Sequence, residues 1–228
     1  MMISFSGTQF PKEVILFAVF FYVRYGVSYR DVEKIMEERG VNVDHSTLNR
    51  WVIKYSPLIA LSAKKNKRAA VSSWRMDETY IKVKGEWIYL YRAVDKFGDT
   101  VDFMLSEKRD EAAATMFFKQ AINDNNFPKQ VVMDKIGANF VGLENINILL
   151  MLAGIICFVE IIQIKYLNNI IEQDHRFIKK ITKPMMGFKS FYSAKATIAG
   201  IEVAHMIRKG QLPNANIPAY KQFMALAV

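Results

Sequence analysis

The chain is poor in the residues on which several protein classes depend. Its 228 residues include one cysteine, Cys157, and three histidines. One cysteine excludes an intramolecular disulfide framework and fits a reducing compartment, and so few Cys and His residues argue against a zinc finger. Internal repeats and low-complexity tracts are also absent.

Long hydrophobic runs and targeting segments are absent as well. The most apolar stretch, residues 146–159, contains Asn147 and stops at Glu160. It falls short of the roughly 20 residues that a membrane helix needs, so a buried helix running into a buried strand is expected. The first ten residues are polar and lack the layout of a signal peptide.

The motifs of nucleotide-binding enzymes are missing too. No Gly-x-Gly-x-x-Gly pattern of dinucleotide-binding enzymes occurs, and the Gly-x-Ser-x-Gly pattern of serine hydrolases is absent as well. Gly137 and Gly142 have Walker-like spacing, but Leu143 and Glu144 follow where Lys and Ser or Thr are needed. Nucleotide hydrolysis and dinucleotide redox chemistry are therefore disfavoured, and no nucleotide cofactor is expected.

Positive charge is abundant and unevenly distributed. The formal net charge is +9, with an isoelectric point near 9.5 and 51% hydrophobic residues, enough for a sizeable core. Residues 1–73 carry 11 basic and 6 acidic side chains, residues 74–164 carry 10 and 13, and residues 165–228 carry 10 and 3. Basic surface suits a phosphate backbone, and concentrated acid suits a divalent cation.

Three helices are predicted near the N-terminus, over residues 11–25, 29–39 and 45–55, the last ending at Ser56-Pro57. Ser28 is a candidate N-cap of the second helix, and Asp44 or Ser46 of the third. The last two helices have the size of a helix-turn-helix, in which early residues of the second helix contact bases. Here those residues are Ser46, Thr47, Asn49 and Arg50. The alternative is a plain helical hairpin with a polar outer face.

A basic link over residues 63–70 places a domain boundary near Ser73. Beyond it the hydrophobic period changes to that of strands, predicted over residues 74–83, 86–94 and 100–106. Alternating elements follow: helices over 109–123, 143–152, 168–181 and 194–209, and strands over 130–133 and 155–162. We therefore predict a helical domain over residues 1–73 and a mixed α/β layer fold over residues 74–228.

Three acids occupy positions that suit metal-dependent phosphoryl transfer. Asp77 lies inside a predicted strand, Asp134 ends another, and Glu172 lies on a helix face with Lys165, Asn168, Arg176 and Lys179. Three carboxylates can hold two Mg²⁺ ions about 4 Å apart. Each acid also has a simpler interpretation: Asp77 as a strand-edge charge beside a solvent-facing Glu78, Asp134 as a turn cap, and Glu172 as an i,i+4 partner of Arg176.

Several long blocks of the chain, in order, resemble bacterial insertion-sequence transposases of the insertion sequence six family. They read SYRDVEKIMEERGVNVDHSTLNRWV, SWRMDETYIKVKGEWIYLYRAVDKFGDTVDF, KYLNNIIEQDHRFIKK and GFKSFYSAKATIAGIEVAHMIRKGQ. The resemblance extends from about Phe5 to Gln211. This family is a branch of the DDE transposases, which have an RNase H-like catalytic core.

The resemblance implies that Asp77, Asp134 and Glu172 form the DDE triad, holding two Mg²⁺ ions with Mn²⁺ as a substitute. It implies DNA cleavage and strand transfer by a homodimer or larger synaptic complex, with a helix-turn-helix bound to the terminal inverted repeats. Lys165, Arg176, Lys179 and Lys180 would then neutralise phosphates of the repeats or of target DNA. A protein with these roles acts in the bacterial cytoplasm, at the nucleoid, and no membrane partner is expected.

The chain departs from the family pattern in the segment between the second and third acids. Asp134 and Glu172 have 37 residues between them, a few more than is usual, and bulky Ile136 and Ile162 stand where a small residue and an arginine are expected. Two alternatives therefore stay open: an inactive or decayed transposase copy, and a helix-turn-helix regulator that binds DNA without cleaving it. A general RNase H-type nuclease is a weaker third.

Overall fold

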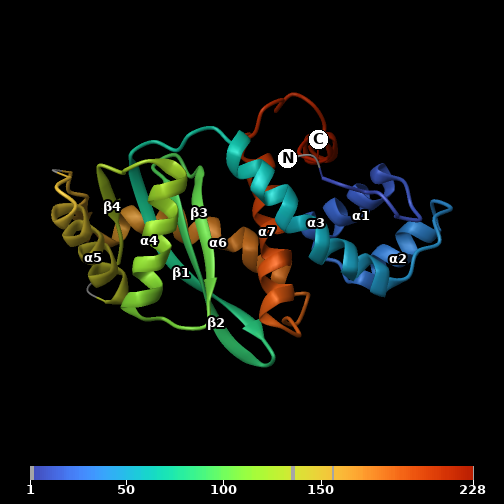
Figure 1. Ribbon diagram of the computed structural model, residues 1–228. Helices are drawn as coiled ribbons and strands as arrows, with labels where there is room; N and C mark the ends of the chain where they lie inside the picture. Colours follow the sequence, from blue (N-terminus) through green and yellow to red (C-terminus); the bar gives the residue numbers. More distant parts are fainter. Residues whose placement is uncertain (1–2, 135–136, 156, 228) are drawn as a thin grey trace. The chain divides into compact units, whose positions relative to one another are not determined.

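The computed structural model describes residues 3–134, 137–155 and 157–227, except for the side chain of Lys165 (Figure 1). The chain divides into two compact units. The first, the helical unit, comprises Met1–Arg68, Val83–Gly85 and Phe177–Val228. The second, the sheet unit, comprises Ala69–Lys82 and Glu86–Arg176.

The described residues of the helical unit include α1 (Lys12–Arg24), α2 (Tyr29–Glu37), α3 (His45–Asn66), α7 (Phe191–Arg208) and α8 (Ala219–Ala225), together with the end of α6 (Asn169–Thr182) from Phe177 onward. Ser28 caps α2 through a reciprocal capping box with Asp31, in which the two bonds measure 2.8 and 3.1 Å. The Asp44 carboxylate caps α3 by accepting from the backbone N–H groups of Ser46 and Thr47. The predicted caps thus fix where α2 and α3 begin.

The predicted end of the third helix is wrong, because α3 continues through Pro57 to Asn66. Beyond the proline, Ile59, Ala60 and Ala63 are all buried. Gly200 of α7 lies so close to α3 that an added Cβ would stand 2.7 Å from Ser56 Oγ. Burial of this apolar stripe against α7 outweighs the local cost of proline inside a helix.

The helical unit is discontinuous in the sequence. Residues from Phe177 onward pack with the N-terminal helices, although they follow the sheet unit in the sequence. Helix α7 is buried along almost its whole length, from Ala194 to Ile207, which explains why it needs helical neighbours on several sides.

The sheet unit contains strands β1 (Ser73–Val83), β2 (Glu86–Asp95), β3 (Thr100–Ser106), β4 (Gln130–Val132) and β5 (Glu160–Ile162), although Val83 itself falls in the helical unit. Their order in the sheet is β3-β2-β1-β4-β5. Strands β2 and β3 pair antiparallel, whereas β4 pairs parallel with both β1 and β5. Lys84 and Gly85 close the β1–β2 hairpin with positive φ angles of 51° and 87°, as a two-residue turn requires.

Helices α4 (Glu111–Asn125) and α5 (Ala138–Leu152) bury one face of the sheet. Trp74 and Met76 of β1 contribute to this core together with Phe117, Phe118 and Leu143. The 3-10 turn Lys165–Asn168 and helix α6 (Asn169–Thr182) follow β5. They contact the other face of β1 through Asn168 and His175. A three-strand meander followed by two parallel strands is the RNase H-like arrangement, so the predicted α/β fold class is confirmed.

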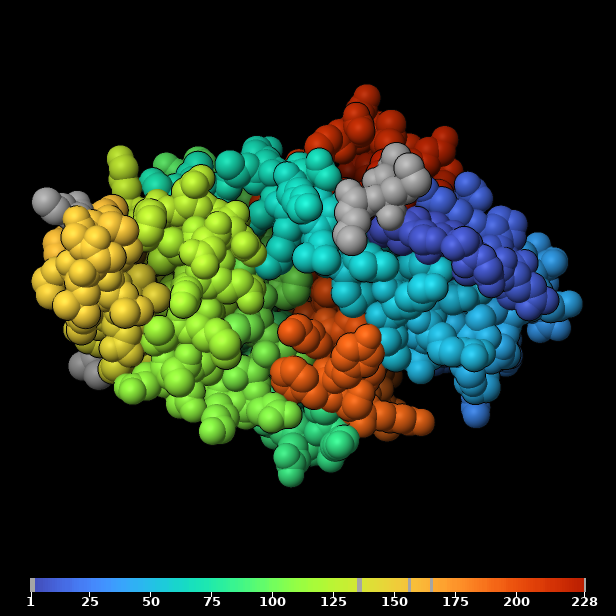
Figure 2. Space-filling model, viewed as in Figure 1, coloured from blue at the N-terminus to red at the C-terminus, as the bar shows by residue number. Residues whose placement is uncertain are grey.

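The edge of the sheet at β5 differs from the prediction. Of the described residues in the predicted strand 155–162, those that pair with β4 are 160–162, and Ile155 and Phe158 are exposed. Helix α5 begins five residues earlier than predicted and exposes Ile148, Leu149 and Leu152 (Figure 2, yellow). Within the described ranges, no helix combines the length and the apolarity needed to cross a bilayer.

Candidate active site

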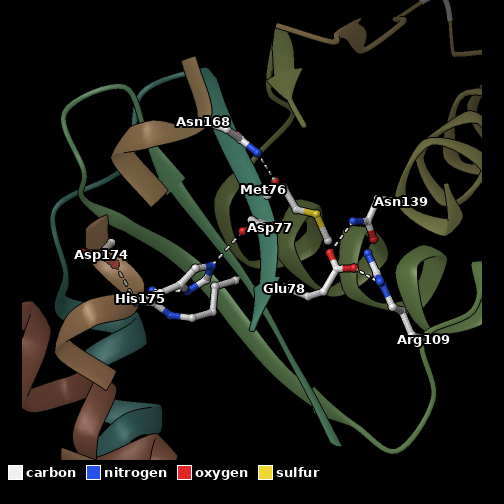
Figure 3. Close-up of polar contacts among 9 residues, drawn as sticks. Met76, Asp77, Glu78, Arg109, Asn139, Asn168, Asp174 and His175 are labelled. Atoms are coloured by element: carbon white, nitrogen blue, oxygen red, sulfur yellow. Dashed lines mark hydrogen bonds and ion pairs between the residues drawn. The ribbon is translucent and has the colours of Figure 1, made fainter. Parts of the chain in front are cut away.

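Asp77 projects from β1 toward α6 (Figure 3). Because side chains alternate along a strand, Asp77 points away from the core that contains Met76. Its Oδ2 lies 3.2 Å from Nε2 of His175, whose side chain is 6% exposed, while the Asp77 side chain keeps 26% of its surface exposed. Asp77 is therefore held on one side by a buried imidazole and remains accessible on the other.

Two contacts with β1 bracket Glu172 on α6. The Asn168 amide donates to the backbone oxygen of Met76 at 3.3 Å, and His175 contacts Asp77. Glu172 comes four residues after Asn168 and three before His175, and side chains at these spacings lie on one helix face. Glu172 itself is exposed. The helix thus presents Glu172 on the face whose neighbours touch the strand at Asp77.

A buried arginine holds α6 in this position. Arg92 of β2 is 1% exposed and donates to Oδ2 of Asp174 at 2.6 Å. Its second terminal nitrogen lies 3.3 Å from Nδ1 of His175. Since a guanidinium only donates hydrogen bonds, Nδ1 must accept, and the ring proton then lies on Nε2, directed at Asp77. The network Arg92–His175–Asp77 consequently orients the carboxylate.

Asp134 follows β4, next to β1 in the sheet. The parallel register pairs Arg75 with Val132. Asp77 and Asp134 each follow this last pair by two residues, so we expect them near each other, since neighbouring strands lie about 4.8 Å apart. On the other side of β4, the backbone N–H of Met133 donates to the backbone oxygen of Ile162 in β5 at 3.0 Å. Asp134 is exposed, and Ile136 lies outside the described residues.

Glu78 is a functional candidate that the sequence interpretation missed. The alternative interpretation of Asp77 as a strand-edge charge has Glu78 facing solvent, but Glu78 is only 8% exposed, so that part of the alternative is wrong. Its Oε2 accepts from the Asn139 side chain at 2.6 Å, and Oε1 pairs with Arg109 (Figure 3). Burial and this carboxylate raise the pKa of Tyr91 to about 12. Since Asn139 lies in the first turn of α5, Glu78 ties the start of this helix to β1.

The donor chemistry of the three acids fits Mg²⁺, a hard cation that prefers carboxylate oxygens and keeps several waters. Within the part of the chain that the structure describes, no three acidic, His or Cys side chains stand close enough to hold one ion. The printed strand pairing ends two residues before Asp77 and Asp134, and Asn168 and His175, on either side of Glu172 in the sequence, contact β1. A shared metal site of all three stays a prediction.

The predicted base-contacting residues lie in the first turns of α3. Ser46 and Arg50 are exposed, and Thr47 and Asn49 are partly exposed. Thr47 donates to Asp44 Oδ2 at 2.6 Å and accepts from Arg50 at 2.8 Å. These hydrogen bonds lower the pKa of the Asp44 carboxyl to about 2.

The basic residues predicted to contact phosphates gather on α6 and the turn before it. Arg176, Lys179 and Lys180 are exposed and follow Glu172 within about two turns of the helix. The side chain of Lys165 lies outside the described residues. Ile162, where an arginine was expected, is partly buried at the end of β5.

A family model for a DDE domain matches residues 71–211. The transposase of the insertion sequence-like element IS431mec from Staphylococcus aureus (strain Mu50) is 43% identical over 206 residues, covering 90% of this chain and 88% of the relative. The transposase of element IS257 in transposon Tn4003 from Staphylococcus aureus is 42% identical over the same length and the same shares.

Solved structures show weaker similarity. The catalytic core domain of BIV integrase has 17% identity and a TM-score of 0.44, with 59% of this chain and 84% of that chain covered. The HTLV-2 integrase catalytic core in complex with magnesium has 15% identity and a TM-score of 0.39, with 71% and 85% covered. Similarity at this level supports no argument about the site.

Proposed function

Because the chain belongs to the DDE transposases of the insertion sequence six family, we propose that it cuts DNA at the ends of an insertion sequence and joins them to target DNA through Asp77, Asp134 and Glu172. The observation that carries this assignment is the placement of Asp77. Its strand pairs with β4 as far as Arg75 and Val132, two residues before Asp77 and Asp134, and Asp77 contacts His175 on the helix that carries Glu172.

The proposed reaction is a pair of in-line displacements at phosphorus. In the first, water attacks a phosphodiester at the element end, a new P–O bond forms, and the bond to the 3′ oxygen breaks to release a 3′-hydroxyl. In the second, that hydroxyl attacks a phosphodiester of target DNA, a new P–O bond joins the element end to the target, and the P–O bond to the target's 3′ oxygen breaks to release a 3′-hydroxyl. Two Mg²⁺ ions, with Mn²⁺ as a substitute, would activate the attacking oxygen and stabilise the leaving oxygen when bound.

The residues of the chain supply the geometry for these steps. Asp77, Asp134 and Glu172 would hold the cations, and His175 orients Asp77 through its Nε2 proton. Arg92 holds His175 and Asp174 together, which fixes α6 against the sheet. Arg176, Lys179 and Lys180, with Lys165, would neutralise phosphates of the strand that enters the site.

We assign DNA recognition to residues 1–73 and catalysis to residues 74–228. Helices α2 and α3 would act as a helix-turn-helix whose Ser46, Thr47, Asn49 and Arg50 contact the terminal inverted repeats. Since two element ends and a target must meet, a homodimer or larger synaptic complex is expected. The DNA substrate places this work at the bacterial nucleoid in the cytoplasm.

A strand-transfer assay with element-end DNA, target plasmid and Mg²⁺ tests the proposal. Wild type should give joined product, and Asp77→Asn, Asp134→Ala and Glu172→Gln should each give none. Glu144→Gln, which removes an exposed acid on α5, is the matched control and should keep wild-type product. Binding of each variant to element-end duplex, measured in EDTA, should be unchanged.

The outcome of the same assay separates the alternatives. End binding without product from the wild type, in either Mg²⁺ or Mn²⁺, would refute catalysis and leave an inactive copy or a regulator. Cleavage without preference for element ends would instead favour a general nuclease.

A further inference from the structure

Near its tip, the β1–β2 hairpin carries a strip of aromatic and basic side chains that the catalytic proposal does not use. The strip consists of Tyr80, Lys82, Trp87 and Tyr89, all in the sheet unit. Trp87 is 62% exposed and Tyr80 is 45% exposed. The hairpin tip reaches the surface at the lower edge of Figure 2 (green).

The strip forms a continuous surface of rings. The Tyr80 ring centroid lies 5.5 Å from that of Tyr89 and 6.5 Å from that of Trp87, the latter edge-on at 78°. Lys82 Nζ lies 6.0 Å from the centre of the Trp87 ring. These rings project from one face of the hairpin, while Ile81 and Ile88 are buried. Tyr89 is partly buried against the core, and the buried pair already stabilises the hairpin, so burial does not explain the exposed rings of Tyr80 and Trp87.

Exposed aromatic rings interleaved with cations are the surface that unpaired nucleic acid prefers. Bases stack on the rings whatever their sequence, and Lys or Arg neutralises the phosphates between them. Lys84 lies in the hairpin turn, and Arg109 adds a positive charge near the rings of Tyr80 and Tyr89. Duplex DNA, whose bases are stacked inside, offers no free base face to these rings.

We propose that Tyr80, Trp87 and Tyr89, with Lys82, form a binding site for single-stranded DNA. Tyr80 is three residues from Asp77 on β1, which corresponds to roughly 10 Å along the strand, and it points to the opposite sheet face. The site therefore suits unpaired bases displaced beside the cut rather than the phosphodiester being cut. That role rests on the proposed function, whereas binding itself requires neither metal nor the triad.

Tryptophan fluorescence gives a direct readout of stacking. Of the three tryptophans, Trp74 is 1% and Trp51 7% exposed, so Trp87 provides most of the solvent-exposed emission. In EDTA, a 20-nucleotide oligo(dT) should quench this emission in the full chain. The Trp87→Phe variant should lose that quenching, which separates Trp87 from Trp51 of α3.

Affinity measurements complete the test. Trp87→Ala should weaken oligo(dT) binding by about 5- to 150-fold, and Trp87→Tyr should restore most of it. Binding to a duplex of equal length should not change. Phe97→Ala is the matched control, because Phe97 is 73% exposed and also carries a lysine, Lys96, 4.9 Å from its ring. It should bind oligo(dT) like the wild type.

Two results would overturn the proposal. The first is equal oligo(dT) affinity in wild type and Trp87→Ala. The second is conversion of an oligomer to a monomer by Trp87→Ala in sedimentation, which would make the strip a protein interface. Asp134→Ala separates the two proposals, because it should lose strand transfer while it keeps oligo(dT) quenching.

Discussion

Substitution of Arg92 by methionine tests the buried network that holds α6 against the sheet. Arg92 is 1% exposed, and its partner Asp174 has a side chain that is 9% exposed. Methionine preserves most of the side-chain volume but removes the guanidinium. Asp174 and His175 then lose a donor in an environment where water cannot replace it.

The expected cost is large because one member of a buried ion pair remains behind. Removing one partner of such a pair costs about 3–5 kcal/mol, and the residual exposure of Asp174 favours the lower end. At about 2–4 °C per kcal/mol for a chain of this size, a loss of about 3 kcal/mol lowers Tm by roughly 6–12 °C. Thermal and urea unfolding followed by circular dichroism would measure both quantities.

Two further variants make the result specific. Arg176→Met removes an exposed arginine from the same helix and should change stability by no more than about 0.5 kcal/mol. The double variant Arg92→Met with Asp174→Leu should recover much of the loss, since no buried charge is left unpaired. A loss below about 1 kcal/mol in Arg92→Met alone would refute the stabilising role of the network.

Three other predictions concern separate parts of the chain. Asn139→Leu should reduce strand transfer by about 10- to 100-fold without changing duplex binding, because Glu78 no longer holds the start of α5, which follows Asp134 in the sequence; full activity would contradict this role. Gly200→Val should destabilise the protein by about 2–3 kcal/mol, because even the added Cβ would stand 2.7 Å from Ser56 Oγ and Val23 Cγ1; an unchanged urea midpoint would exclude such tight packing. Because the pKa of Asp44 falls from 3.8 to about 2 on folding, its contribution is present above about pH 4 and is lost as pH falls toward 2. Asp44→Asn should therefore flatten acid unfolding in this window, and superimposable acid titrations of wild type and variant would refute the linkage.

Local signals predicted most of the secondary structure. Ser28 and Asp44 mark helix starts because their side chains satisfy backbone N–H groups within the same turn. Lys84-Gly85 marks the hairpin because Gly85 readily adopts the positive φ that the turn needs. These signals depend only on neighbouring residues, so the bounds of α2, β1 and β2 agree with the predictions to within two residues.

Features that depend on distant partners could not be predicted in this way. Helix α3 crosses Pro57 because α7, more than a hundred residues away in sequence, buries its second half, and the short helix α8 carries no strong local signal. For the same reason the sequence identified Asp77, Asp134 and Glu172 as candidates but did not predict which side chains surround them. Arg92 contacts Asp174 across 82 residues, and Glu78 contacts Asn139 across 61. No sequence motif links residues at such separations, so these contacts could not be predicted from the sequence.

The brevity of β5 has a practical consequence for handling the protein. An edge strand of three residues offers few unpaired backbone groups for pairing with another chain, so the sheet is protected from aggregation at this edge. The neighbouring aliphatic side chains of α5 have no such protection, with Leu152 75% and Leu149 52% exposed. The protein should therefore self-associate reversibly through this surface at high concentration. The Leu152→Lys variant should reduce this self-association, as measured by light scattering.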